Sequence, residues 1–260
     1  MSLALIAGAG ELPPALVAEL DRPPLICALE GVRPALPVAL RFRLERLGGF
    51  LRELRARGIE RVCMAGGITR PSIDWRAFDV GTLRLLPVML RALRAGDDGA
   101  LRAFIGVLEA RGLRVVGAHE IAPRLVAAAG VPTLAQPGAA HRQMALAGEA
   151  HLDTMGRRDS GQACILRAGR VVAEEDVRGT DALIARTTGA GGLLYKGPKP
   201  GQDRRADLPV IGPGTARGIV AAGLDGIVIE AGGVMVLDRA QTVRLLDEAG
   251  RFLWVREREA

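Results

Sequence analysis

The sequence predicts a two-part α/β protein, in which a doubly wound parallel sheet in the first half is followed by a smaller mixed α/β half. In the first half, short apolar runs alternate with helical patterns, which is typical of parallel strands joined by right-handed crossovers. In the second half, several apolar runs follow one another across glycine turns, as in hairpins. The chain has 260 residues, 49% apolar and 25% charged, so it can form a full core in one large or two small domains.

Five short runs predict the strands of the first half. The clearest are residues 3–7, 25–29 and 61–64, which are apolar and too short for buried helices. Residues 41–47 are a candidate for a third strand in chain order. Residues 113–116 predict the last strand of this half.

Helical patterns lie between these runs. They predict helices that begin near residue 12 and cover residues 50–57, 83–95 and 100–111. Pro13 and Pro14 are tolerated in the first helix, because the first N–H groups of a helix have no partner within it. The polar residues 96–99 separate the last two helices. Either Asp97 or Asp98 is expected to cap the helix that follows.

Residues 130–138 contain Pro132, Pro137 and two glycines, a composition that is typical of a linker. This segment therefore predicts the boundary between the two halves. We therefore expect a Rossmann-like N-terminal domain over residues 1–130, a linker over 131–141 and a mixed α/β C-terminal domain over 142–260.

The second half contains three helical patterns and several short extended runs. The helices are expected at residues 141–157, 181–186 and 239–249. The extended runs are residues 163–167, 171–173, 193–195, 210–211, 227–230, 234–237 and 252–255. Glycine turns join 163–167 to 171–173 and 227–230 to 234–237, so each of these pairs predicts a hairpin.

The composition narrows the class of partner. A net charge of +6 is compatible with nucleic acid, an anionic membrane or a phosphorylated substrate, but the basic residues are spread along the helices. Aromatic residues are only 3%, which argues against a stacking platform for single-stranded nucleic acid, and no nucleic acid partner is expected. Cys27, Cys63 and Cys164 have no zinc or redox spacing and favour free thiols. With no apolar run of about 18 residues and no basic leader, a cytoplasmic protein is expected.

A glycine turn follows the first predicted strand and opens a helix. Gly8 and Gly10 would let the backbone approach a phosphate at the helix N-terminus. The third glycine of the dinucleotide fingerprint is absent, and Pro13 stands there. Glu30 lies about 20 residues on, at a strand end where such folds hold a ribose. An ordinary turn, a phosphate contact and a dinucleotide site all remain open.

A second glycine loop, from Gly66 to Thr69, also follows a predicted strand. Ligands of open α/β sheets bind beyond the carboxyl ends of the strands, so two loops at one edge favour a binding site there. Glu120 comes shortly after another strand. Thr180 and Asp181 begin a predicted helix, where capping is the simpler interpretation.

The only two lysines among 35 basic residues are Lys196 and Lys199, in the segment Lys196-Gly197-Pro198-Lys199-Pro200. Proline favours polyproline II, in which residues three apart point the same way, about 9 Å from each other. Asp203 and Asp207 follow nearby, with Arg204 and Arg205 between them. Two ammonium groups beside carboxylates suit a phosphate with a divalent cation. An exposed charged loop is the alternative.

Taken together in their order and spacing, these motifs resemble the LpxI family of UDP-2,3-diacylglucosamine diphosphatases. The resemblance runs from residue 4 to about residue 238. The segments that carry it are residues 5–13, 65–71, 96–98, 117–120, 159–162, 179–182 and 196–209. It is strongest in residues 196–209. The chain departs from the family pattern at Ala9, Gly67, Asp203 and Arg178.

The resemblance implies Mg²⁺-dependent hydrolysis of the diphosphate of UDP-2,3-diacylglucosamine, in lipid A biosynthesis. Water would attack the phosphorus next to uridine, giving UMP and 2,3-diacylglucosamine 1-phosphate. It also implies that Asp207 is catalytic, as a metal ligand or as a general base. The substrate-binding residues would be Gly8, Gly10, Gly66, Thr69, Thr180, Lys196 and Lys199. Asp98, Glu120 and Asp181 are expected to assist Asp207 at the metal.

Two other functions stay open from the residues alone. The turn at Gly8 and Gly10 with Glu30 is compatible with a dinucleotide-dependent oxidoreductase. The basic charge is compatible with a non-catalytic nucleotide-binding module.

A lipid substrate would also bring the protein to the inner membrane. Residues 82–95 place Arg84, Arg91 and Arg94 beside four leucines, and a basic amphipathic helix of this kind can lie on anionic lipid. We expect weak, peripheral contact with the membrane surface, with an ordinary core helix as the alternative. A homodimer is left open.

Overall fold

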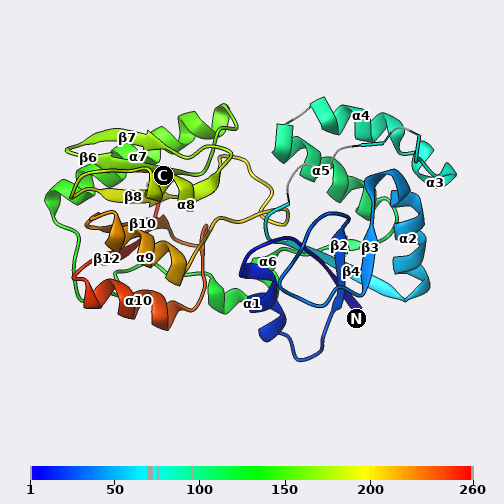
Figure 1. The fold of residues 1–260 in the computed structure, drawn as a ribbon, viewed down its shortest axis with the longest axis horizontal. Helices are drawn as coiled ribbons and strands as arrows, with labels where there is room; N and C mark the ends of the chain where they lie inside the picture. The colour runs from blue at the N-terminus through cyan, green and yellow to red at the C-terminus, as the bar shows by residue number, and fades with distance from the viewer. Residues whose placement is uncertain (1, 69–72, 75, 95, 259–260) are drawn as a thin grey trace. The chain divides into compact units, whose positions relative to one another are not determined.

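The computed structural model describes residues 2–68, 73, 74, 76–94 and 96–258, and the side chains of residues 91–98 lie outside that description. The chain forms two compact units (Figure 1). Unit 1 contains Met1–Pro123 together with Asp203–Asp207, and unit 2 contains Arg124–Gln202 together with Leu208–Ala260. Asp203–Asp207 belongs to unit 1, although the residues on either side of it belong to unit 2. We call this segment the strap.

The sheet of unit 1 has five parallel strands in the order β3-β2-β1-β4-β5. They are β1 (Ser2–Ala7), β2 (Leu25–Leu29), β3 (Leu40–Phe42), β4 (Ile59–Ala65) and β5 (Arg114–Val115). The order changes direction between β1 and β4, so the predicted doubly wound sheet is confirmed. The predicted strand at 41–47 is wrong beyond Phe42, because a 3₁₀ turn (Leu44–Arg46) follows it and leads into a helix.

The helices of unit 1 are α1 (Leu12–Ala18), α2 (Leu47–Ala56), α3 (Val80–Leu83), α4 (Leu86–Arg94), α5 (Gly96–Glu109) and α6 (Ala118–Ile121), with a further 3₁₀ turn at Pro123–Leu125. Helix α2 packs on β4, and α5 packs on β5. Buried side chains such as Leu54, Val62 and Leu108 form the core between these helices and the sheet.

Two helix limits differ from the sequence prediction. The helix predicted at 83–95 is broken between α3 and α4, because Pro87 has no N–H for the carbonyl of Leu83 and its ring opposes a continuous helix. Residues 96–99 are not a connection but the first turn of α5. Asp97 and Asp98 therefore follow the first helical residue, so neither occupies the predicted capping position before the helix.

Unit 2 has a mixed sheet of five strands in the order β12-β10-β8-β6-β7. They are β6 (Ala163–Arg167), β7 (Arg170–Glu174), β8 (Leu193–Lys196), β10 (Gly226–Glu230) and β12 (Phe252–Arg256). β8, β10 and β12 are parallel, whereas β6 is antiparallel to β7 and β8. The predicted mixed α/β fold and the β6–β7 hairpin are confirmed. Ala168 and Gly169 form the tight turn between β6 and β7, and both have the positive φ that such a turn requires.

The second predicted hairpin is wrong. Residues 234–237 contain β11 (Met235–Val236), which pairs in parallel with β9 (Val210–Ile211) in a separate two-stranded sheet. β10 cannot accept a hairpin partner, because β8 and β12 already occupy both of its edges.

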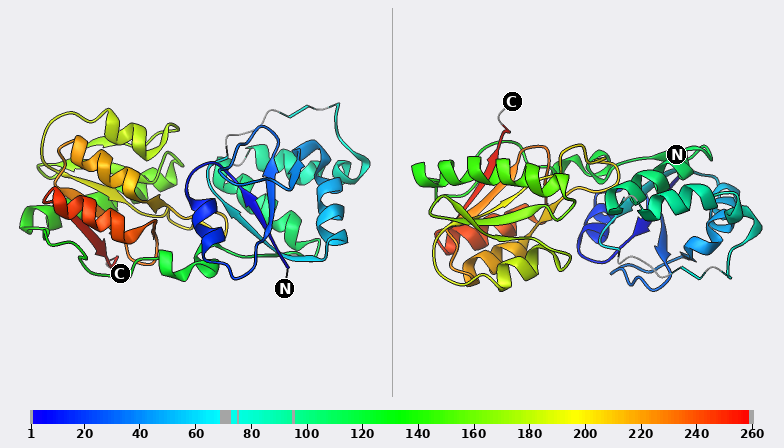
Figure 2. Two further views of the ribbon diagram at one scale, coloured as in Figure 1. Left: turned by 60° about the horizontal axis from the view of Figure 1, so that its bottom comes forward. Right: turned by 90° about the horizontal axis from the view of Figure 1, so that it is seen from above.

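Helices cover both faces of the unit 2 sheet, as Figure 2 shows. They are α7 (Ala139–Arg157), α8 (Gly179–Ala185), α9 (Pro213–Ala221) and α10 (Arg239–Glu248). Alternate strand residues face opposite sides: Tyr195 and Val228 join the α7 cluster, while Leu194 and Ile227 join the cluster beneath α8 and α9. Within the described residues, no helix combines the length and apolar character needed to cross a bilayer.

The residues predicted as a linker run along unit 2. The hydroxyl of Thr133 accepts a hydrogen bond from the Leu253 N–H at 2.9 Å, and the Leu134 N–H donates to Asp247 at 2.7 Å. Gly130 bridges to Val255, and α7 begins at Ala139. The units divide earlier in the chain, between Pro123 and Arg124.

Candidate active site

The two glycine loops of unit 1 meet at the carboxyl ends of β1 and β4. The Ala9 N–H donates to Gly67 O at 2.8 Å, and the Gly67 N–H donates to Ala9 O at 2.9 Å. A Cβ at Gly8 would lie 2.5 Å from the carbonyl carbon of Gly66, so only glycine permits this approach. Gly66 and Gly10 both have positive φ, which favours glycine as well. The structure thus brings the two predicted loops together where the strand order reverses, the usual ligand position in such sheets.

Helix α1 offers few donors to a phosphate at this edge. Pro13 and Pro14 fall in its first turn and carry no N–H, so two of the N–H groups that a dinucleotide pyrophosphate would use are missing. Glu30 is exposed, and its N–H donates to Phe42 O. This turn therefore lacks the donor set of a dinucleotide site.

Glu120 acts as a local cap. One of its carboxylate oxygens accepts the Gly117 N–H at 2.8 Å, and the other lies 3.7 Å from the Arg114 guanidinium. Its carboxylate thereby closes the first turn of α6, and a Cβ at Gly117 would clash with the His119 ring. Of the other predicted site residues of unit 1, Thr69 lies outside the described residues, and Asp98 is described only by its backbone in α5.

Asp207 ends the strap and is exposed. The strap residue before it, Ala206, is 7% exposed and lies in the apolar core of unit 1. Arg205 donates to Glu109 at 2.6 Å and to both oxygens of Asp203 at 3.0 and 2.8 Å. Asp207 is therefore a solvent-facing carboxylate on a segment with firm anchors.

Lys196 and Thr180 come together in a buried polar chain in unit 2. The Lys196 ammonium donates to Thr180 Oγ1 at 2.7 Å and to Val210 O at 3.0 Å. Thr180 donates to Glu175 at 2.5 Å, and the other Glu175 oxygen accepts the Gln162 N–H at 2.6 Å. The capping role predicted for Thr180 or Asp181 is wrong, since α8 begins at Gly179 with Arg178 as its N-cap residue. Asp181 is exposed on α8.

The second lysine has a different partner. Lys199 Nζ lies 2.5 Å from Asp159 Oδ1, and its side chain is 16% exposed. The Lys199 N–H donates to the side chain of Gln202 at 3.1 Å. Lys199 is therefore more accessible than Lys196, which is 8% exposed. Through its hydrogen bonds, Lys196 links α8 and Val210 to the end of β8.

The charged ends of the strands beside β8 were not among the residues predicted from the sequence. β8, β10 and β12 end in Lys196, Glu230 and Arg256, all less than a tenth exposed. Arg256 bonds Glu149, and Glu230 lies 3.7 Å from Arg258. The sequence does show a charged residue at the end of each apolar strand. It does not show which residues these charges contact, because the partners are distant in sequence.

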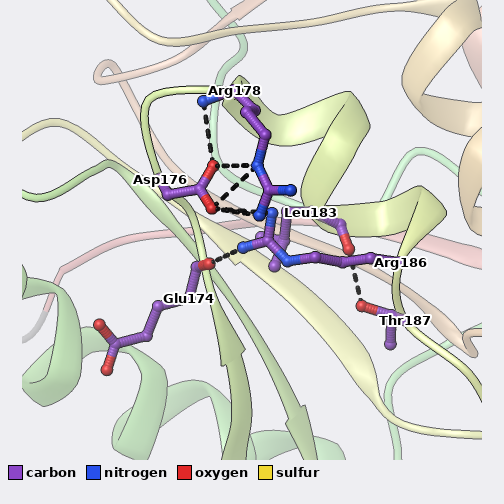
Figure 3. A network of polar contacts seen from close by, with 6 residues as sticks. All are labelled: Glu174, Asp176, Arg178, Leu183, Arg186 and Thr187. Atoms are coloured by element: carbon purple, nitrogen blue, oxygen red, sulfur yellow. Dashed lines mark hydrogen bonds and ion pairs between the residues drawn. The ribbon is translucent and has the colours of Figure 1, made fainter.

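A second polar network stands at the start of α8 (Figure 3). Arg178 donates to both oxygens of Asp176, at 2.7 Å in its shortest contact, and Arg186 lies 3.2 Å from the same carboxylate. The hydrogen bonds from Arg178 hold the pKa of Asp176 well below its usual range, so this carboxylate stays ionised. The arginine that departs from the family pattern is thus engaged with its own loop.

Among side chains that the structure describes, no three His, Cys, Asp or Glu residues are grouped as a metal site. Glu120 is engaged as a cap, and Asp181 belongs to unit 2 while Asp207 belongs to unit 1. Asp207 is an exposed residue of unit 1, and the side chain of Asp98 lies outside the described residues.

Thr180→Val is expected to destabilise the protein by about 1–3 kcal/mol, because it leaves a buried ammonium and a carboxylate each without one partner. Urea unfolding followed by circular dichroism measures the change. Thr154→Val, at a partly exposed threonine on α7, is the matched control and should stay within about 0.5 kcal/mol of wild type. Equal stability of both variants would argue against the polar chain.

Comparison with known proteins places both units in one family. The model of the LpxI N-terminal domain matches residues 2–125, and that of the LpxI C-terminal domain matches residues 128–254. A curated relative from Caulobacter vibrioides, named UDP-2,3-diacylglucosamine pyrophosphatase LpxI, is 34% identical over 271 aligned positions. The alignment covers 96% of this chain and 96% of the relative.

Proposed function

We propose, because this chain belongs to the LpxI family, that it hydrolyses the diphosphate bond of UDP-2,3-diacylglucosamine in lipid A biosynthesis. The products would be UMP and 2,3-diacylglucosamine 1-phosphate. The observation that carries the proposal is an alignment at 34% identity that covers 96% of both chains, so the similarity to the relative extends through both units. The hydrolase class follows from the same relative.

In the proposed reaction, water attacks the phosphorus next to uridine. Asp207 is the residue we assign to this step, because it is an exposed carboxylate on an anchored strap. Two roles suit it: taking the proton of the attacking water, or holding a metal ion beside the diphosphate. Lys199 supports the reaction by neutralising a phosphate oxygen, for which its ammonium would leave Asp159. Lys196, held by Thr180, adds fixed positive charge at the end of β8.

Mg²⁺ fits this donor set as an ion shared with the substrate. Mg²⁺ is usually held by one or two carboxylates together with substrate phosphates, rather than by a complete protein cage. Asp207 supplies such a carboxylate, and the diphosphate supplies the remaining charge. When bound, the ion would polarise the phosphoryl group and stabilise the charge that develops on it.

The test is to incubate the protein with UDP-2,3-diacylglucosamine and Mg²⁺ and to separate the products. Release of UMP that stops with EDTA and resumes with added Mg²⁺ is the expected result. A spectral change of NADPH with no UMP would instead indicate an oxidoreductase, and nucleotide binding without turnover would indicate a binding module.

Contact with an anionic membrane is the second part of the proposal. Helices α3 and α4 of unit 1 carry four large apolar side chains that are well exposed, namely Val80, Leu83, Val88 and Leu90. Arg84 is exposed among them, and no acidic residue occurs from Val80 to Arg94. An apolar surface with basic residues suits a membrane interface.

We expect weak binding to anionic vesicles that falls as salt rises. Leu83→Glu should reduce the bound fraction in sedimentation at low salt, because it places a carboxylate on this apolar surface. Leu134→Glu, at an exposed leucine of unit 2, is the control and should bind as wild type does. Binding that ignores salt, or is absent at low salt, would contradict the expectation.

A further inference from the structure

We propose that Glu109 and Arg205 are positioning residues that hold Asp207 in place for hydrolysis, an inference that rests on the function proposed above. The starting point is the path of the chain. After Gln202 the chain leaves unit 2, contributes the strap to unit 1, and returns to unit 2 at Leu208. Asp207 is the last strap residue and thus stands where the chain passes from one unit to the other.

The residues on either side of Asp207 are both buried. Ala206 is 7% exposed in the core of unit 1, and Leu208 is 3% exposed in unit 2. Within the strap, the Ala206 N–H donates to Asp203 O at 2.9 Å, which folds the strap into a turn. The backbone of Asp207 therefore has little freedom as long as this turn keeps its place on unit 1.

Arg205 ties the turn to a helix. Its Nε and one Nη donate to the two oxygens of Asp203, at 3.0 and 2.8 Å, and its other Nη donates to Glu109 at 2.6 Å. The bonds to Asp203 are internal to the strap. The bond to Glu109 reaches a separate element, the end of α5, so the pair Glu109–Arg205 is a polar anchor of the strap on unit 1.

The position of Glu109 is not explained by the helix that carries it. Glu109 is the last residue of α5, where the helix dipole disfavours a carboxylate. Sequence neighbours do not explain it either, because its partner is 96 residues away. Holding the strap accounts for an acidic residue at this site.

Loss of the anchor should affect turnover more than substrate binding. Neither Glu109 nor Arg205 is assigned a contact with the substrate, and Ala206 would still fill the core. Without this anchor the strap would be free to shift, and misplacement of a reacting group by about 1 Å can cost about 10² in rate. A positioning role therefore predicts a lower kcat with little change in KM.

The test compares Glu109→Gln with Glu53→Gln. Glu53 forms an ion pair with Arg57 on α2 of the same unit at 2.7 Å, and its side chain is 43% exposed, as is that of Glu109. We expect kcat of Glu109→Gln to fall about tenfold or more with KM within about twofold. Glu53→Gln should match wild type. Arg205→Lys keeps the positive charge but loses the planar guanidinium that bonds Asp203 and Glu109 together, so it should also lower kcat.

The role of Asp207 is tested by a double-mutant cycle. If Glu109 acts through Asp207, Glu109→Gln should not lower the residual rate of Asp207→Ala any further. Additive losses, or a kcat of Glu109→Gln and Arg205→Lys equal to that of wild type, would overturn the proposal. A wild-type protein without hydrolysis would refute the proposed function instead. In that case hydrogen exchange of the strap amides still tests the anchor: faster exchange in Glu109→Gln than in Glu53→Gln supports it, and equal exchange refutes it.

Discussion

Asp207→Ala is expected to fold, to keep its substrate and to lose about 10²–10⁴ in the rate of hydrolysis. The residue is exposed, so its truncation leaves no cavity in the core. Its carboxylate is the group assigned to the water or the metal, and neither role passes to alanine. UMP release at saturating substrate and Mg²⁺ measures the loss.

The control for this variant is Asp21→Ala, which removes another exposed carboxylate of unit 1. It should turn over as wild type does. Circular dichroism and retained binding of UDP-2,3-diacylglucosamine show that Asp207→Ala is folded. Turnover of the folded Asp207→Ala within about tenfold of wild type would remove Asp207 from the chemistry, since an exposed ion pair is worth at most about 1 kcal/mol.

The second large effect is expected at Lys199. A charge-assisted hydrogen bond to phosphate is worth about 1.5–3 kcal/mol, so Lys199→Ala should lower kcat/KM by about ten- to a hundredfold or more. Lys199→Arg should restore only part of it, because a planar fork does not replace a compact ammonium. The measurement is kcat/KM from initial rates of UMP release.

Lys199 is a cleaner test of charge than Lys196. Lys196 is buried and holds Thr180 and Val210, so Lys196→Ala would change the fold around it as well as the charge. Asp159→Asn is a useful comparison, because it removes the protein partner of Lys199 and keeps the ammonium. A kcat/KM of Lys199→Ala equal to that of wild type would remove the ammonium from the mechanism.

Local patterns predicted the elements well where local physics decides them. β2 is an apolar run with both ends where expected, and the β6–β7 hairpin follows from its turn. The prediction failed where a partner distant in sequence decides. β11 reads as the second strand of a hairpin, but it pairs with β9 because both edges of β10 are taken.

The site residues also divide into those that local sequence identifies and those that a distant contact defines. Lys196, Thr180 and Asp207 stand in motifs that can be recognised from sequence. Glu175 and Glu109 could not be found in this way, because each is defined by a contact across the fold: Glu175 through Thr180 to Lys196, and Glu109 through Arg205. Acidic residues in strand and helix ends are usually solvated, so their sequence context carries no signal.

The most direct test of the central claim is hydrolysis of UDP-2,3-diacylglucosamine by the wild-type protein in water enriched in oxygen-18, with Mg²⁺ present. Mass spectrometry of both products shows which phosphorus the water attacked. We expect the heavy oxygen in UMP and none in 2,3-diacylglucosamine 1-phosphate. Label in the 1-phosphate, or the absence of UMP among the products, would contradict it.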